Sequence, residues 1–356
     1  MNKIIIILMA AMTVCATATA KSKSPARKLI NRLYDLQKRG TLIGHQDALF
    51  YGTTWKWEFG RSDINDVCGD YPAVLGCDLG GIEHGNDRNL DGVPFDKMRE
   101  QIIDFAQKGG IVTISWHADN PANGGNAWNV DAPAVAQSLP GGALHAKMTQ
   151  WIARTIDFIK SLKDSNGRPI PVIFRPWHEM TGSWFWWGTP HCTAKEYQSL
   201  FRMVVRQFRK ARIDNVVWSY SPGADAHDTP QRFFNAYPGD RYVDLLGFDI
   251  YQYNGPEEFV ATCRLDLKIM HDYAQKHRKL YAITETGYRN TPDEKWFTNV
   301  LRPAYQGFSP CYVLLWRNAW DQKEENFGPA PEKSCAEDFR LFHKDNATLF
   351  LNDIRN

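Results

Sequence analysis

Eight short apolar segments constrain the fold of this chain more than any other feature of its sequence. Each is followed by a polar or aromatic stretch and then by an amphipathic segment. The apolar segments predict strands at residues 41–44, 73–77, 111–116, 172–176, 216–220, 243–248, 280–284 and 312–316. The amphipathic segments predict helices at residues 25–39, 95–108, 146–163, 194–211, 230–236, 256–277, 296–305 and 335–344.

Continuously apolar strands that alternate with helices are typical of parallel strands buried on both faces. Eight such units favour a closed (β/α)8 TIM barrel, an α/β fold, as a single domain. An open doubly wound sheet is the alternative, but no glycine-rich phosphate loop follows the first strand. Long loops follow strands one, two, three and eight, so we expect a cleft at the C-terminal face of the strands.

The N-terminus has the pattern of a secretory signal peptide. Lys3 precedes an apolar run at residues 4–14, and the small-residue sequence Ala18-Thr19-Ala20 follows. We expect cleavage after Ala20, which gives a signal peptide at residues 1–20 and a catalytic domain at residues 21–356. The run is too short to cross about 30 Å of hydrocarbon, so no membrane anchor is expected. The protein is therefore expected to be exported, to the periplasm or out of the cell.

Composition restricts the partners. The formal net charge is +2, from 42 basic and 40 acidic residues that are scattered along the chain, which argues against nucleic acid. Aromatic residues make up 13% of the chain and include 13 Trp. Flat apolar faces in that number suit the stacking of sugar rings.

Cysteine and histidine spacing gives no sign of a metal site or of another cofactor. The chain has no CxxC and no HExxH motif, so zinc is not expected. Removal of the signal peptide would leave six Cys residues in an oxidising compartment, with 15 possible pairings. Cys77 and Cys311 lie within apolar strand patterns and are expected to be buried thiols.

The segment at residues 171–188, PVIFRPWHEMTGSWFWWG, changes abruptly from a buried strand to reactive and aromatic residues. A Glu beside His178 and several Trp side chains can have a raised pKa, because an apolar wall disfavours its charged form. Glu179 is therefore a candidate acid, although an ion pair with Arg175 would explain it equally well from this segment alone.

Reactive side chains also follow other strands. They are His45, Asp78, His117, Asp249 with Tyr251, Glu285, and Trp316 with Arg317. A barrel can place Glu179 and Glu285 face to face across its mouth. Two opposed carboxyl groups are what glycoside cleavage requires, one protonated and one ionised. Arg175 and the Tyr251 hydroxyl are expected to favour the ionised form of Glu285.

At these motifs the chain resembles glycoside hydrolase family 26, the endo-β-1,4-mannanases and their relatives. The matching segments are RPWHEM at 175–180, GSWFWWG at 182–188, GFDIY at 247–251, ITETG at 283–287 and WRN at 316–318. The resemblance implies a retaining, double-displacement mechanism with Glu179 as acid/base and Glu285 as nucleophile.

The resemblance also implies the residues that bind the sugars. His117 and His178 would contact the sugar at the cleavage point, and Tyr251 would hydrogen-bond Glu285. Trp316 would lie beneath that sugar, Trp184 would stack on the leaving-group side, and Arg317 would bind the next sugar toward the non-reducing end. Asp249 would support the His and Tyr network, and Trp128 would line the third loop.

The predicted substrate is therefore the β-1,4-mannosidic chain of mannan, glucomannan or galactomannan, or its oligosaccharides, bound by a monomer. Two alternatives remain open at this point. The same fold and mechanism could act on another β-glycan, such as xylan or mixed-linkage glucan. A glycan-binding protein without activity would lack one of the two Glu residues, and both are present.

Overall fold

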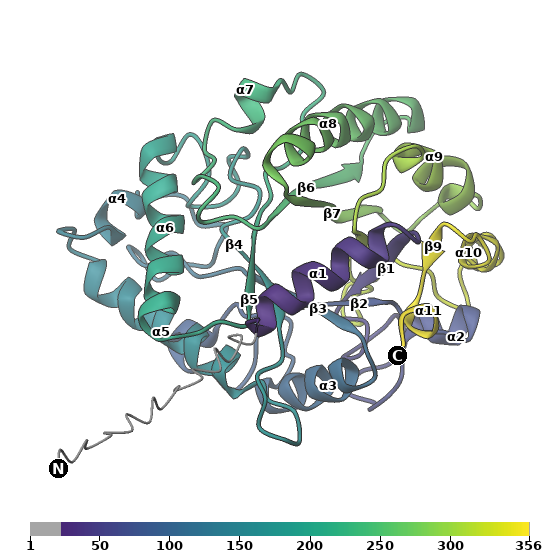
Figure 1. Ribbon diagram of the computed structural model, residues 1–356, viewed down its shortest axis with the longest axis horizontal. Coiled ribbons are helices and arrows are strands. Elements are labelled where there is room, and N and C mark those ends of the chain that lie inside the picture. Colours follow the sequence, from purple (N-terminus) through teal and green to yellow (C-terminus); the bar gives the residue numbers. More distant parts are fainter. Residues whose placement is uncertain (1–22, 356) are drawn as a thin grey trace, which may run out of the picture.

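Eight parallel strands form a closed barrel in the computed structural model, which describes residues 23–355 (Figure 1). The predicted signal peptide lies outside the described residues. The strands are β1 (Thr41–Gln46), β2 (Val74–Asp78), β3 (Ile111–Trp116), β4 (Val172–Pro176), β5 (Val216–Tyr220), β6 (Leu245–Gln252), β7 (Leu280–Tyr288) and β8 (Tyr312–Leu315). Because β1 pairs with both β2 and β8, the ring closes. The predicted (β/α)8 barrel is thus confirmed.

Helices surround the barrel, and most of them were predicted. They are α1 (Pro25–Gln37), α3 (Phe95–Gln107), α5 (His145–Ser161), α6 (Ala194–Lys210), α7 (Pro230–Phe233), α8 (Pro256–His277) and α10 (Ala336–His343). The helix expected at residues 296–305 is a π-helix, η2 (Phe297–Leu301), that continues into α9 (Arg302–Tyr305). Helix α1 precedes the first strand and lies across one open end of the barrel in Figure 1, where it contacts β1, β5 and β7.

Several short elements were not predicted, because each is too short to show a periodic pattern. They are α2 (Asp63–Cys68), the 3-10 helix η1 (Ile82–His84), α4 (Val135–Ser138), β9 (Thr348–Leu349) and α11 (Leu351–Ile354). Strand β9 pairs in parallel with the beginning of β1, on the outside of the ring.

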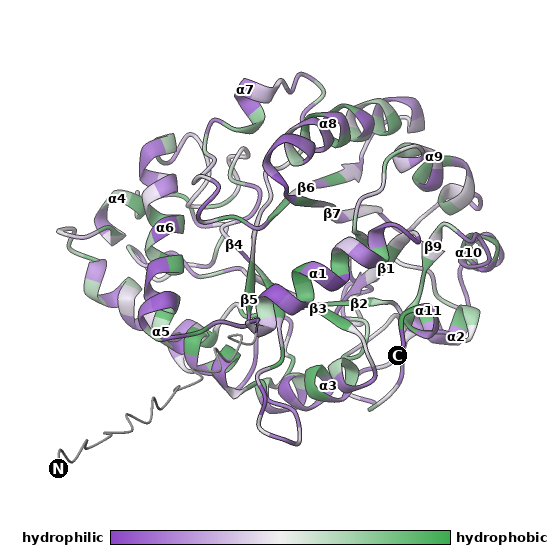
Figure 2. Ribbon diagram, viewed as in Figure 1, coloured by the Kyte–Doolittle hydropathy of each residue, from purple (hydrophilic) through white to green (hydrophobic). Residues whose placement is uncertain are grey.

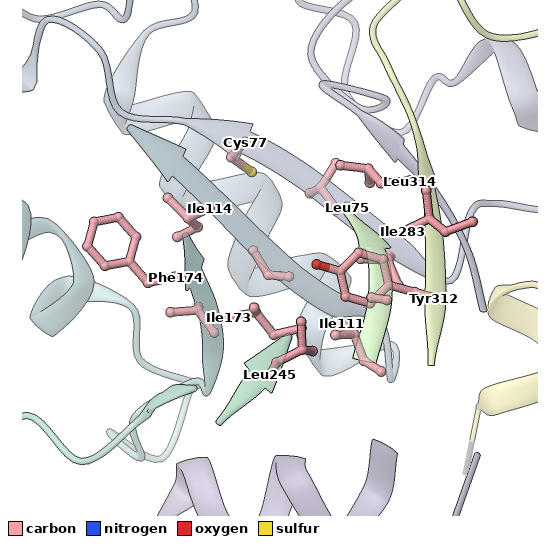
Figure 3. Packing of buried hydrophobic residues seen from close by; sticks show 14 of the residues in the cluster. Leu75, Cys77, Ile111, Ile114, Ile173, Phe174, Leu245, Ile283, Tyr312 and Leu314 are labelled. Carbon is pink, nitrogen blue, oxygen red and sulfur yellow. The ribbon is translucent and has the colours of Figure 1, made fainter. Parts of the chain in front are cut away.

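The core has two parts, one inside the barrel and one between the strands and the helices. Figure 2 shows apolar strands at the centre and helices with one apolar and one polar face. Figure 3 shows side chains from several strands packed together, among them Leu75, Ile173, Ile283 and Tyr312. Trp218 of β5 is buried against Phe174 and Phe208.

The six Cys residues of the described part of the chain are unpaired thiols. Cys77 and Cys311 are fully buried, as predicted.

Within residues 23–355, every helix is too short or too polar to span a membrane.

Candidate active site

The loop that follows β4 positions Glu179 through an unusual backbone. Trp177 and Glu179 both have left-handed φ angles, 57° and 53°, which non-glycine residues rarely adopt. The Glu179 N–H donates to the carbonyl of Ser221 over 2.7 Å, and the indole of Trp187 donates to the carbonyl of His178 over 2.7 Å. Backbone conformations of this kind concentrate at functional sites, where surrounding contacts fix them.

A β-bulge positions the second carboxyl group. Phe248 of β6 pairs with Ile283 of β7, but the next residue, Asp249, pairs with Glu285, so Thr284 is the extra residue. The Thr284 hydroxyl lies close to β6 and donates to the Asp249 carboxylate over 2.6 Å. A Cβ on Gly247 would meet the Thr284 side chain at 2.4 Å, so the bulge requires glycine there. Bulges re-aim side chains, and this one places Glu285 beside Asp249.

Arg175 joins the two carboxylates beneath the barrel mouth. Its guanidinium donates to Asp249 over 2.7 Å and to Glu285, and all three side chains are buried. The Tyr251 hydroxyl donates to the other Glu285 oxygen over 2.7 Å. The predicted contacts of Arg175 and Tyr251 with Glu285 are therefore present. Asp249 differs from its predicted place, because its side chain bonds to Arg175 and Thr284 instead of a His or Tyr.

Glu179 has the environment of an acid. Burial and the nearby Glu285 charge raise the pKa of Glu179 to about 7. The Trp184 indole donates to the Glu179 carboxyl over 2.6 Å, which favours the charged form and opposes the increase. One carboxyl oxygen from each of Glu179, Asp249 and Glu285 lies within 4.8 Å of the other two.

Two histidines connect the site to β2 and β3. His117 lies 2.7 Å from the Asp78 carboxylate, and although burial opposes it, this contact raises the pKa of His117. The pKa of His178 is lowered by burial and by the Arg175 charge. The two Nε2 atoms are 3.2 Å apart, so one ring can donate to the other.

Among residues 23–355, two groups of side chains have the spacing of metal ligands, and the members of both already have partners. In the group at Glu179, Asp249 and Glu285, the Arg175 guanidinium already supplies a positive charge. The other group is Glu83, His84 and Asp119. There the Glu83 carboxylate accepts hydrogen bonds from the Trp116 indole and the Asp119 N–H.

A cavity of about 570 Å³ lies at the C-terminal ends of the strands. Nine of the ten predicted site residues line it, namely His117, Trp128, His178, Glu179, Trp184, Asp249, Tyr251, Glu285 and Trp316. The tenth, Arg317, is not among the lining residues; it follows Trp316, which is, and forms a 2.5 Å ion pair with Asp91. Asp91 comes from the loop after β2, and no local sequence pattern marked it.

Only part of the aromatic run faces the cavity. Trp184 is 46% exposed, whereas Trp186 and Trp187 are fully buried beneath the loop. Trp128 is 47% exposed and stacks on the His117 ring, with centroids 5.2 Å apart. Phe185 and Phe327 also line the cavity. Phe185 belongs to the aromatic run but was not assigned to the site, and Phe327 stands alone in its loop, where a single Phe carries no positional signal.

A barrel whose mouth holds two nearby carboxyl groups, one with a raised pKa and one bonded to Arg and Tyr, among exposed Trp side chains, is the arrangement of a glycoside hydrolase. Comparison with known proteins supports the same class of enzyme. Residues 18–260 match the model of glycosyl hydrolase family 26. The matched part includes Glu179 and ends before Glu285. The chain belongs to glycosyl hydrolase family 26.

Solved structures and curated proteins include several relatives. A family 26 β-mannanase from Bacteroides ovatus is 41% identical, with a TM-score of 0.91, over 93% of this chain and 96% of that one. A modular endo-β-1,4-mannanase from Cellulomonas fimi is 30% identical, with a TM-score of 0.85, over 94% of this chain and 77% of that one. A mannan endo-1,4-β-mannosidase from Bifidobacterium adolescentis is 31% identical over 82% of this chain. The match spans about a third (31%) of that curated relative.

Proposed function

We propose that this protein is an exported, monomeric, retaining endo-β-1,4-mannanase that hydrolyses the main chain of mannan, glucomannan or galactomannan. The observation that carries the proposal is the pair of carboxyl groups with different environments. The pKa of Glu179 is raised to about 7, whereas Glu285 accepts hydrogen bonds from Arg175 and Tyr251. The choice of mannan is supported by the names of the relatives from Bacteroides ovatus, Cellulomonas fimi and Bifidobacterium adolescentis.

The proposed reaction has two displacements. Glu285 attacks the anomeric carbon while Glu179 gives its proton to the departing glycosidic oxygen, which forms a covalent mannosyl-enzyme. Glu179 then takes a proton from water, and the water oxygen attacks the same carbon and releases Glu285. Retaining enzymes have carboxyl groups about 5–5.5 Å apart, and inverting enzymes about 6.5–9.5 Å. Oxygens of Glu179 and Glu285 within 4.8 Å support the retaining route.

Product analysis tests the proposed substrate. Linear β-1,4-mannan, xylan and mixed-linkage glucan are each incubated with the protein, and products are followed over time. A ladder of manno-oligosaccharides from mannan alone is expected. Mannobiose as the first and dominant product would indicate release from a chain end instead of endo action. Cleavage of xylan or glucan alone would refute the proposed substrate.

The pH dependence of kcat/KM tests the role of Glu179. Because the acid must carry its proton and its pKa is raised to about 7, kcat/KM should fall as the pH rises through about 7. Trp184→Phe removes a hydrogen bond that stabilises the charged form, so this fall should move to higher pH, by about 0.5 unit.

The matched control is Trp128→Phe, which alters the other strongly exposed Trp of the same cavity but removes no bond to Glu179. In this variant, kcat/KM should fall over the same pH range as in the wild-type protein, whatever its absolute value. An equal shift of this pH range in both variants would contradict the assignment of the fall in kcat/KM to Glu179.

A further inference from the structure

The active-site cavity extends beyond the residues used in the proposed mechanism. Besides the residues described above, its lining includes six polar or aromatic side chains from the segments that follow β6, β7 and β8. They are Tyr253, Asn254, Glu258, Thr262, Arg289 and Glu325. We call this part of the cavity the side lobe. The mechanism proposed above uses none of the six.

The side lobe lies beside the expected path of the glycan, rather than along it. Trp184 follows β4 and Arg317 follows β8, which are opposite strands in a ring of eight. A chain that contacts both therefore crosses the mouth from the β4 side to the β8 side. Most of the side lobe follows β6 and β7, which are on one flank of this path, while Trp128 and His117 follow β3 on the other flank.

The side lobe also adjoins the reacting groups. The ring of Tyr253 is 6.2 Å from that of Tyr251, which bonds to Glu285. A group that lies against Tyr253 is therefore close to the sugars that flank the cut bond.

The walls of the lobe suit a small neutral polyol. Tyr253 is 76% exposed and offers an aromatic face. Asn254 donates to Glu258 over 3.0 Å, and Arg289 forms a 3.0 Å ion pair with Glu325, which joins the loops after β7 and β8. Amide, carboxylate and guanidinium groups at fixed positions around an aromatic face can donate to and accept from several hydroxyls.

We propose that the side lobe binds a single galactosyl group attached by an α-1,6 bond to a mannosyl residue that flanks the cut bond. The inference rests on the proposed β-mannanase function. The C6 hydroxymethyl of a β-1,4-linked mannosyl residue projects sideways from the main chain, so a sugar on this carbon lies at the flank, where the lobe is. Branched mannan is then cut both next to its galactosyl branches and within unsubstituted stretches of its main chain.

The test compares a linear manno-oligosaccharide with the same oligosaccharide carrying one α-1,6-galactosyl group. The readout is the ratio of kcat/KM on the branched to that on the linear substrate, which does not depend on the fraction of folded enzyme. Tyr253→Ala removes the aromatic face and should lower the ratio about threefold to tenfold. Asn254→Trp places a bulky ring in the lobe at an exposed position and should lower the ratio about tenfold or more. Phe59→Ala, which alters an exposed aromatic residue outside the cavity lining, should leave the ratio unchanged.

Product mapping gives a second, independent readout. Products of galactomannan hydrolysis by the wild-type protein should include fragments with galactose on the terminal mannosyl residue created by the cut. Branches found only at least one residue away from every cut, or ratios unchanged in both lobe variants, would overturn the proposal. Failure to cleave linear mannan at all would instead refute the proposed function, so the two failures are distinguishable.

Discussion

Glu285→Ala should lower kcat/KM on manno-oligosaccharides by about 10⁴-fold or more, because the first displacement loses its nucleophile. The side chain is buried and bonded on both oxygens, to Arg175 and Tyr251, which hold it in position. Initial rates of product release measure the loss. Asp249, the other carboxylate of Arg175, remains as a counter-charge, so the variant is expected to fold.

The control for this loss is Glu337→Ala, which removes an exposed carboxylate on α10 that is not part of the cavity lining. It should retain wild-type activity. Azide adds a test of the route. In Glu285→Ala, azide should attack the anomeric carbon directly from the face opposite the leaving group and give an α-mannosyl azide. A β-azide from this variant would contradict the assignment of Glu285 as nucleophile.

Glu179→Ala should have an effect that depends on the leaving group. On manno-oligosaccharides, whose departing alkoxide needs a proton, kcat/KM should fall by about 10²–10⁴-fold. On a dinitrophenyl β-mannobioside the leaving group departs without a proton, so the first displacement should remain fast and a burst of dinitrophenolate should precede slow turnover. Stopped-flow absorbance measures both phases.

Azide distinguishes this variant from the first. Azide should attack the mannosyl-enzyme in place of the unassisted water, restore turnover on the activated substrate and give a β-mannosyl azide. Equal losses on both substrates, or an α-azide, would contradict the role of Glu179 as acid/base.

The positions of the strands were predictable because their apolar residues are continuous. The residues at which the strands end were not predictable. The prediction ended the sixth strand at Phe248 and the seventh at Thr284, where polar residues begin. The structure continues β6 to Gln252 and β7 to Tyr288. Polar side chains can continue a buried strand here because they satisfy one another, as Asp249 and Thr284 do, and this pairing is invisible in either segment alone.

The site was predictable where a short motif contains the chemistry, as around Glu179, Tyr251 and Glu285. It was not predictable where chemistry depends on contact between distant segments. The Asp91–Arg317 ion pair joins residues 226 positions apart, and Arg289–Glu325 joins two separate loops. The bulge at Thr284 is also a property of two strands, because it is defined by the register of β7 against β6.

The two ends of the described chain are at the same end of the barrel, away from the cavity. The first turn of α1 bonds to Asp214, just before β5, and the segments around β9 and α11 bond to residues at the starts of β1 and β2. The cavity is at the opposite ends of the same strands. Attachment to a solid support, or genetic fusion of a carbohydrate-binding module, through either terminus would therefore leave the mouth facing away from the point of attachment and open to long polysaccharides.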